Sequence, residues 1–132
     1  MQLQVSVDYA VRILRYLHLC KGEVQVAKEI AESVDMTYPF FNKVAGQLRR
    51  KGLLDTIQGR NGGYVLGRPA HEISIYDIQV SLVGEPQLHC CLKNGKRCAY
   101  GEKNACKTHT FLQTLQGKMV EELSGRTIAD LT

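Results

Sequence analysis

Four of the chain's five cysteines lie in one short polar segment, CCLKNGKRCAYGEKNACKTH, which runs from residue 90 to residue 109. Thiolates ligate iron and zinc, form disulfides and react with oxidants, so this segment holds the residues most able to do chemistry. The N-terminus has no basic region followed by an uninterrupted apolar run, so we expect neither an export signal nor a membrane span. We therefore expect a cytoplasmic protein, in which clustered cysteines indicate metal binding or redox chemistry.

The spacing of the thiols favours an iron–sulfur cluster over zinc. Six residues separate Cys91 from Cys98, and seven separate Cys98 from Cys106. Zinc sites usually contain closer cysteine pairs, whereas a loop without apolar periodicity lets distant thiolates converge on a cluster. Zinc remains an alternative, and so do bare redox-active thiols with a disulfide between Cys91 and Cys106. Five cationic side chains near the thiols suit the redox alternative: Lys93, Lys96, Arg97, Lys103 and Lys107.

The residues before the cysteines predict a winged helix-turn-helix. Apolar residues at helical spacing predict helices over residues 5–20 and 26–33, and a third helix that starts after an N-cap at Thr37 and ends before Gly52. A tight connection between the second and third helices is typical of a helix-turn-helix. Strands over 53–57 and 64–66, joined by the turn GRNGG, predict a β-hairpin that forms a wing, at about residues 54–66.

This order of elements predicts DNA binding, with the third helix entering the major groove. Asn and Gln side chains can read adenine edges, and Lys can read guanine or neutralise phosphate. An arginine at the wing tip is placed to reach the minor groove. The candidate contacts are Tyr38, Asn42, Lys43, Gln47, Arg50, Arg60 and Asn61.

The C-terminal part of the chain predicts two more helices. Ser74 and Asp77 form a capping-box pattern at the start of a helix that ends near residue 83. A longer helix over 107–124 carries a narrow apolar stripe, which predicts a homodimer seam. The stripe consists of Phe111, Leu112, Leu115, Met119 and Leu123. The expected division is a DNA-binding domain over 1–84, a cluster-binding loop over 85–106, and a dimerisation helix with a capped turn over 107–132.

Composition agrees with this architecture, which is mainly α with one small β-hairpin. The chain has 132 residues, is 44% hydrophobic and 23% charged, and has a net charge of +4. Such a chain can bury a core, and its mild positive charge is compatible with nucleic acid. Phosphate-binding and dinucleotide-binding glycine motifs are absent, and no nucleophile–base set stands out, so we expect that the chain is not an enzyme.

Three stretches resemble winged-helix regulators of the IscR, NsrR and CymR type, the Rrf2 family. They are "DYAVRILRYL", "LRRKGLLDTIQGRNGGYVLGRP" and "TIADL". The resemblance implies homodimers that bind pseudo-palindromic promoter DNA. Members often carry an arginine just before the first wing glycine, where this chain has Gln58, with its arginine at Arg60 instead.

One branch of this family holds an iron–sulfur cluster between the fourth and fifth helices, and the cysteine segment resembles that branch. The resemblance implies ligands Cys91, Cys98 and Cys106, with His109 as the fourth, and it favours a 2Fe-2S over a 4Fe-4S cluster. Asp8 of the other subunit is the rival fourth ligand, and Cys90 could replace Cys91. We expect a preparation made in air to lose the cluster readily.

We therefore expect a homodimeric transcription regulator, acting as a repressor, that senses nitric oxide, redox conditions or iron–sulfur status through its cluster. Two alternatives remain open. One is a thiol-based redox regulator without a cluster, and the other is a CymR-like regulator that acts through a protein partner.

Overall fold

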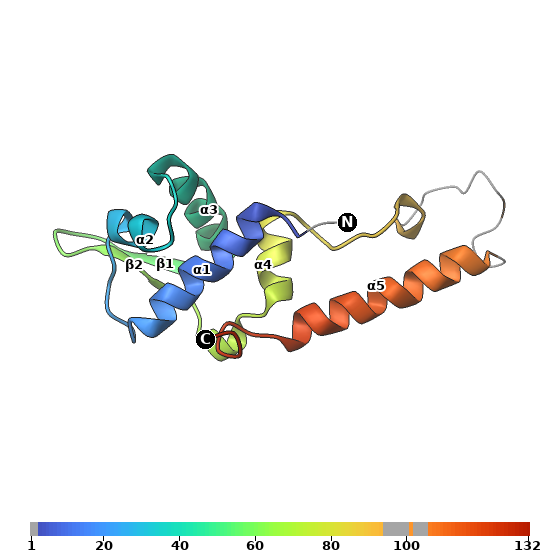
Figure 1. The fold of residues 1–132 in the computed structure, drawn as a ribbon. Helices are drawn as coiled ribbons and strands as arrows, with labels where there is room; N and C mark the ends of the chain where they lie inside the picture. Colours follow the sequence, from blue (N-terminus) through green and yellow to red (C-terminus); the bar gives the residue numbers. More distant parts are fainter. Residues whose placement is uncertain (1–2, 94–100, 102–105) are drawn as a thin grey trace.

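The fold is known from a computed structural model, which describes residues 3–93, 101 and 106–132. Figure 1 shows a body of short helices and one hairpin, from which a single long helix extends. The elements in chain order are α1 (Val5–Leu19), α2 (Ala27–Ser33), α3 (Tyr38–Arg50), β1 (Leu54–Ile57), β2 (Gly63–Leu66), η1 (Ala70–Glu72), α4 (Ile75–Leu82), η2 (Cys90–Leu92) and α5 (Lys107–Gly125). This confirms the predicted fold class. No helix of the described residues is long and apolar enough to cross a membrane.

Local signals fix the helix-turn-helix. The Thr37 hydroxyl accepts a hydrogen bond from the Phe40 backbone N–H at 3.4 Å, which caps the first turn of α3. Pro39 lies in that turn, where a missing N–H costs nothing. The chain leaves α3 through Gly52, whose φ of +76° is a left-handed conformation that glycine adopts without strain. These two ends hold α3 at a defined position against α2.

The hairpin is antiparallel, and its register runs from Leu54 opposite Leu66 to Ile57 opposite Gly63. Gln25 adds a third short segment, because its backbone N–H and C=O both pair with Tyr64, at 3.0 and 2.8 Å. At the tip, a Cβ on Gly62 would lie 2.2 Å from the Ile57 carbonyl oxygen, so only glycine fits there. The wing is therefore tied to the segment before α2 as well as to its own partner strand.

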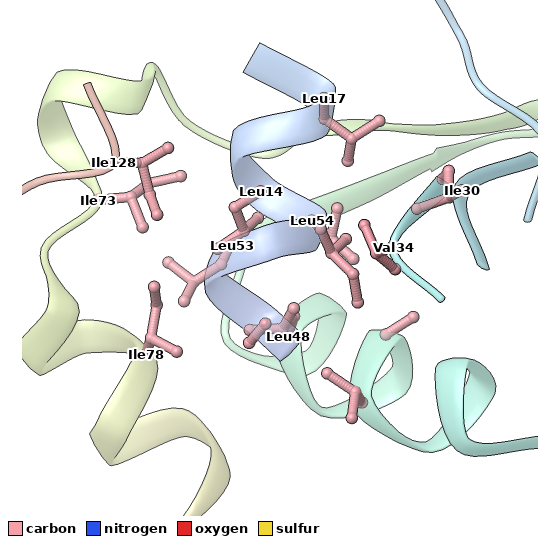
Figure 2. Packing of buried hydrophobic residues seen from close by; sticks show 14 of the residues in the cluster. Leu14, Leu17, Ile30, Val34, Leu48, Leu53, Leu54, Ile73, Ile78 and Ile128 are labelled. Atoms are coloured by element: carbon pink, nitrogen blue, oxygen red, sulfur yellow. The ribbon is translucent and has the colours of Figure 1, made fainter. Parts of the chain in front are cut away.

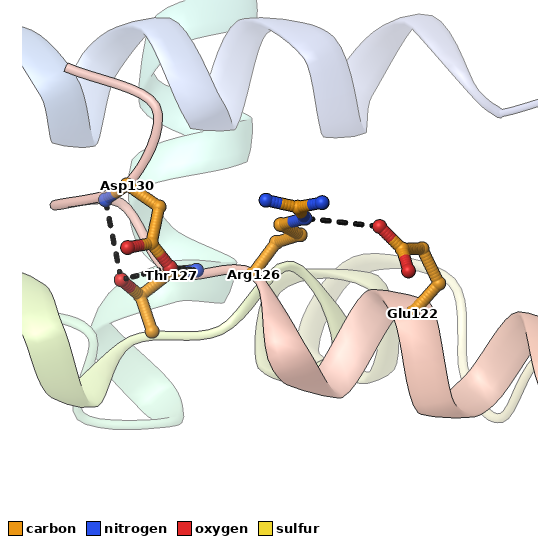
Figure 3. Close-up of polar contacts among 4 residues, drawn as sticks. All are labelled: Glu122, Arg126, Thr127 and Asp130. Carbon is orange, nitrogen blue, oxygen red and sulfur yellow. Dashed lines mark hydrogen bonds and ion pairs between the residues drawn. The ribbon is translucent and has the colours of Figure 1, made fainter.

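One apolar core joins the body, and it includes a residue from the far end of the chain. Ile128 is fully buried beside Ile73 (Figure 2), and its N–H donates to the Ile73 carbonyl at 2.9 Å. The Ile75 N–H donates to the Arg126 carbonyl at the same distance. The Asp130 carboxylate accepts from the Thr127 N–H at 2.9 Å, which closes a turn around Ile128 (Figure 3). The segment after α5 is thus part of the winged-helix body.

Helix α5 leaves part of its apolar stripe exposed. Its C-terminal end packs near α4, and the helix then runs away from the body towards the cysteine segment (Figure 1). Phe111 is 62% exposed and Leu115 43% exposed. His109 is the one buried residue of this helix in the described chain. A single chain therefore covers the α5 stripe only in part, at Leu123, and leaves Phe111 and Leu115 exposed.

Two single-turn helices were not expected from the sequence. The first, η1, follows Pro69, and the second, η2, lies within the segment that was predicted to be a loop. The prediction of an irregular segment was therefore wrong at Cys90–Leu92. The His89 side chain caps η2, since its Nδ1 accepts from the Cys91 N–H at 3.2 Å.

Candidate DNA-binding surface and cysteine site

The residues predicted to contact DNA lie on α3 and at the wing tip, and all but one are exposed. Along α3, Tyr38, Asn42, Lys43 and Arg50 are exposed and Gln47 is half-buried, while the opposite face of the helix lies in the core. Arg60 and Asn61 are exposed at the wing tip. Sequence periodicity had sorted these side chains correctly into polar and buried faces. A polar helix face is exposed whether it contacts water or DNA, so the exposure of these side chains is compatible with DNA contact.

Helix α1 adds a cation next to α3 that sequence reasoning missed. The Tyr9 ring packs edge-on against the Phe40 ring, with centroids 5.5 Å apart. The Arg12 guanidinium lies 5.3 Å from the centre of the Tyr9 ring and 3.1 Å from the Asp8 carboxylate. Because Phe40 lies in the first turn of α3, these contacts hold Arg12 beside the end of α3 that would enter a groove. The i,i+4 spacing of Asp8 and Arg12 was the available signal.

Three of the predicted cluster ligands come together at the start of α5. The Cys91 sulfur lies 3.4 Å from His109 Nδ1, and the Cys106 sulfur accepts from the His109 backbone N–H at 3.4 Å, capping α5. His109 is only 9% exposed, and its imidazole contacts the Cys91 sulfur while its backbone N–H contacts the Cys106 sulfur. Cys98, the remaining predicted thiolate, lies outside the described residues.

The two alternative ligands are placed differently. Cys90 is exposed, and its sulfur lies 3.8 Å from His89 Nδ1, next to the group around His109. Asp8 lies on α1, where its carboxylate forms an ion pair with Arg12. Within one chain, Cys90 is therefore beside the candidate site and Asp8 is engaged elsewhere.

The donor types fit an iron–sulfur cluster, although the described residues do not by themselves form a metal site. Cys91 and Cys106 are free thiols, and both contact His109, Cys91 at the imidazole and Cys106 at the backbone N–H. Thiolate with histidine is a ligand set that such clusters use. No group of three or more His, Cys, Asp or Glu side chains is arranged to hold a metal among the described residues, and the third thiol falls outside them.

The segment leading to the cysteines is anchored on both sides. The Leu88 N–H donates to Gln116 Oε1 of α5 at 2.9 Å. The Tyr76 hydroxyl of α4 donates to Glu85, and this hydrogen bond raises the pKa of Tyr76. The cysteine site is thus linked through short contacts to the long helix and to the DNA-binding body. Neither anchor was predicted, because polar side chains at these positions carry no periodic signal.

Comparisons with known proteins agree with this architecture. The Rrf2 family model, described as "Iron-dependent Transcriptional regulator", matches residues 3–132. The HTH-type transcriptional regulator NsrR of Shouchella clausii is 30% identical over 133 residues, covering 99% of this chain and 88% of the relative. Such relatives are transcription regulators, which confirms the prediction that the chain is not an enzyme.

Solved structures show the same fold at lower identity. CymR, the global cysteine regulator of B. subtilis, matches with a TM-score of 0.78 at 24% identity, covering 99% of this chain and 95% of that one. IscR of T. potens matches with a TM-score of 0.75 at 23% identity, covering 99% and 85%. The family match extends over nearly the whole length, with the winged body, the cysteine segment and α5 in one alignment. This chain belongs to the Rrf2 family of transcriptional regulators.

Proposed function

We propose that the chain acts as a homodimeric repressor that binds pseudo-palindromic operator DNA and senses nitric oxide, redox conditions or iron–sulfur status through a cluster. The observation that carries the proposal is the convergence of Cys91 and Cys106 on His109 at the start of α5. A change of ligation there acts directly on the first turn of the helix whose stripe needs a partner. Cytoplasmic location is part of the same proposal.

The cluster would be held by Cys91, Cys98, Cys106 and His109. It would supply a group that can gain or lose an electron and react with nitric oxide, and 2Fe-2S is favoured over 4Fe-4S. The protein's part is to orient the donors. The Cys106 sulfur caps α5, and the His89 side chain fixes the Cys91 backbone. Because imidazole binds iron less tightly than thiolate does, His109 is the ligand at which the site is most easily opened.

DNA recognition would be divided between α3 and two flanking cations. The exposed Asn42, Lys43 and Gln47 side chains would read base edges in the major groove. Arg60 would enter the minor groove from the wing, and Arg12 would contact a phosphate beside the start of α3. Loss of the cluster would relax the segment joined to Gln116 and change the spacing of the two recognition helices.

A second candidate is a thiol-based regulator without a cluster. The contact between the Cys91 sulfur and the His109 imidazole favours it, because a thiol beside an imidazole suits redox chemistry. The exposed Cys90 would then be the thiol most open to oxidants. A CymR-like regulator working through a protein partner is the third reading, supported only by likeness of fold.

Iron and sulfide analysis tests the cluster. The protein is purified without oxygen, its visible absorption is recorded, and iron and acid-labile sulfide are assayed for wild type, Cys98→Ala and Cys20→Ala. We expect a coloured wild type and Cys20→Ala with iron and sulfide in comparable amounts, and a colourless Cys98→Ala. Cys20 lies at the end of α1, outside the segment, so its variant controls for general thiol loss. A colourless wild type without iron would contradict the cluster and favour the thiol-based regulator instead.

Salt-dependent DNA binding tests the regulator itself. Operator affinity of the wild type should fall steeply as salt rises, because bound cations release counterions from DNA. Arg60→Ala should lower affinity roughly tenfold and reduce the salt slope by about one, while Lys118→Ala on α5 should leave both unchanged. Equal binding by wild type and Arg60→Ala would show that the wing arginine does not contribute to operator affinity.

A further inference from the structure

A cavity of about 590 Å³ opens on the body, away from both sites described above. It lies where the end of α1, the end of β2, η1 and the turn after α5 meet. Four of its lining residues are apolar and buried or half-buried, and we call them the floor: Leu17, Leu66, Ala70 and Ala129. Lys21 and Arg68 also line it and are exposed, and we call them its edge. The volume and the mixture of an apolar lining with a few polar groups are those of small-molecule sites.

The charges at this cavity are unbalanced. Lys21 and Arg68 are exposed, and neither side chain has an ion pair or hydrogen bond to another side chain within the described part of the chain. Glu23 is the one carboxylate among the lining residues, against these two cations; the His71 imidazole, also in the lining, lies 3.8 Å from the Glu72 carboxylate. An ammonium and a guanidinium offer only hydrogen-bond donors, so a ligand here must bring acceptors and a negative charge.

The backbone at the cavity edge is held in an uncommon conformation. Lys21 has a φ of +53° and is followed by Gly22 at +85°, so two successive residues are left-handed. For a residue other than glycine this conformation costs about 1 kcal/mol or more, and such residues cluster at ligand sites. The turn brings Lys21 to the edge of the cavity immediately after α1 ends.

DNA is a poor occupant for this cavity. Strand β1 packs against α3, whereas β2 packs against α1, so the cavity lies on the α1 side of the hairpin. The exposed side chains of α3 do not line it. A phosphodiester backbone would also leave the apolar floor without a partner. The apolar floor and the cationic edge together suit a small molecule with one charged end.

We propose that this cavity binds a small organic monocarboxylate whose aliphatic or aromatic body rests on Leu17, Ala70 and Ala129 and whose carboxylate meets Lys21 and Arg68. Leu66 of the floor is the last residue of β2. The next residue, Gly67, donates its N–H to the Leu53 carbonyl at 3.0 Å. A bound carboxylate therefore stabilises the base of the wing and adds an effector site independent of the cysteines.

The test uses methyl-labelled alanine and a matched pair of probes, sodium benzoate and neutral benzamide. Titration to tens of millimolar benzoate should shift the Ala70 and Ala129 methyl signals in a saturable way. The Ala45 methyl, buried in α3, should stay in place and report that the protein remains folded. Benzamide, which has the same body without the charge, should produce much smaller shifts.

Charge removal completes the test. The double variant Lys21→Gln and Arg68→Gln should weaken benzoate binding by at least roughly tenfold, the loss expected for even one charge-assisted hydrogen bond. The control variant Lys28→Gln, on the exposed side of α2, should bind benzoate as the wild type does. The proposal is overturned if benzoate leaves both methyl signals unmoved, if benzamide shifts them equally, or if the double variant binds unchanged.

Discussion

Helices α1 and α5 are both amphipathic, yet they end up in opposite situations. Five apolar residues of α1 are at most 2% exposed: Val7, Ala10, Ile13, Leu14 and Leu17. In α5, which is longer, Phe111 and Leu115 remain exposed and the buried residue is a histidine. An apolar stripe indicates that a helix buries that face, but it does not indicate whether the same chain or another chain packs against it. The contrast shows that α1 is covered within its own chain, whereas α5 keeps exposed apolar residues that suit the proposed dimer seam.

Placing a charge on the α5 stripe should give the largest effect. We expect Leu115→Asp to raise the dimer dissociation constant at least about a hundredfold, because each partner would bury an unpaired carboxylate at the seam. Light scattering across a dilution series measures this. Gln113→Asp, on the opposite side of the same helix, is the control and should leave the dimer intact. A persistent Leu115→Asp dimer would place the seam elsewhere.

Truncating a core residue should act on the fold instead. Ile128→Ala should lower the free energy of unfolding by about 2–5 kcal/mol, since it empties a fully buried position. Leu131, three residues further on, is 41% exposed, and its alanine variant should lose less than about 1 kcal/mol. Denaturant unfolding of both variants gives the comparison. Equal losses would mean that the segment after α5 does not belong to the body.

Breaking the hydrogen bond between the cysteine segment and α5 should have a smaller effect than either Leu115→Asp or Ile128→Ala. Gln116→Leu removes the acceptor of the Leu88 N–H, a loss of about 1–2 kcal/mol in local stability. Hydrogen exchange at the Leu88 amide should then speed up roughly tenfold. Gln113→Leu should leave that amide as it is in the wild type. Unchanged exchange in Gln116→Leu would show that the anchor does not hold the segment.

The smallest effect concerns the turn around Ile128. Hydrogen bonds from the Thr127 N–H and hydroxyl lower the pKa of Asp130 in the folded state. The unfolded chain therefore takes up the proton at a higher pH, and the stabilisation is present at neutral pH and is lost as pH falls below about 4. Asp130→Asn should be slightly less stable than wild type at pH 7, with the gap closing in acid. A gap independent of pH would exclude this carboxylate as its source.

The sequence predicts those parts of the fold that carry strong local signals. The cap at Thr37 and the stop at Gly52 placed α3 closely, and the capping box of Ser74 and Asp77 is present as expected. By contrast, η2 depends on the His89 side chain as a cap, a contact with no periodic pattern. The burial of Ile128 depends on tertiary packing that a short apolar motif does not reveal.

The sequence predicted which residues belong to the candidate site, but only part of how they are positioned. The family resemblance implied Cys91, Cys106 and His109 as ligands, and these residues do come together. The anchors at Gln116 and Glu85 could not be predicted, because a single polar side chain is compatible with solvent as well as with a specific partner. Arg12 was missed because it approaches α3 through Tyr9, whose ring partner Phe40 is distant in sequence.

The position of Ile128 also affects how the protein reaches its fold. Val7 and Ile128 belong to one buried cluster, so the core contains contacts between segments at nearly opposite ends of the sequence. Contacts of such high sequence separation slow folding, because a long loop must close before they form. The DNA-binding body therefore cannot finish folding until the chain has passed through α5. A newly made regulator would acquire its long helix before its core is complete.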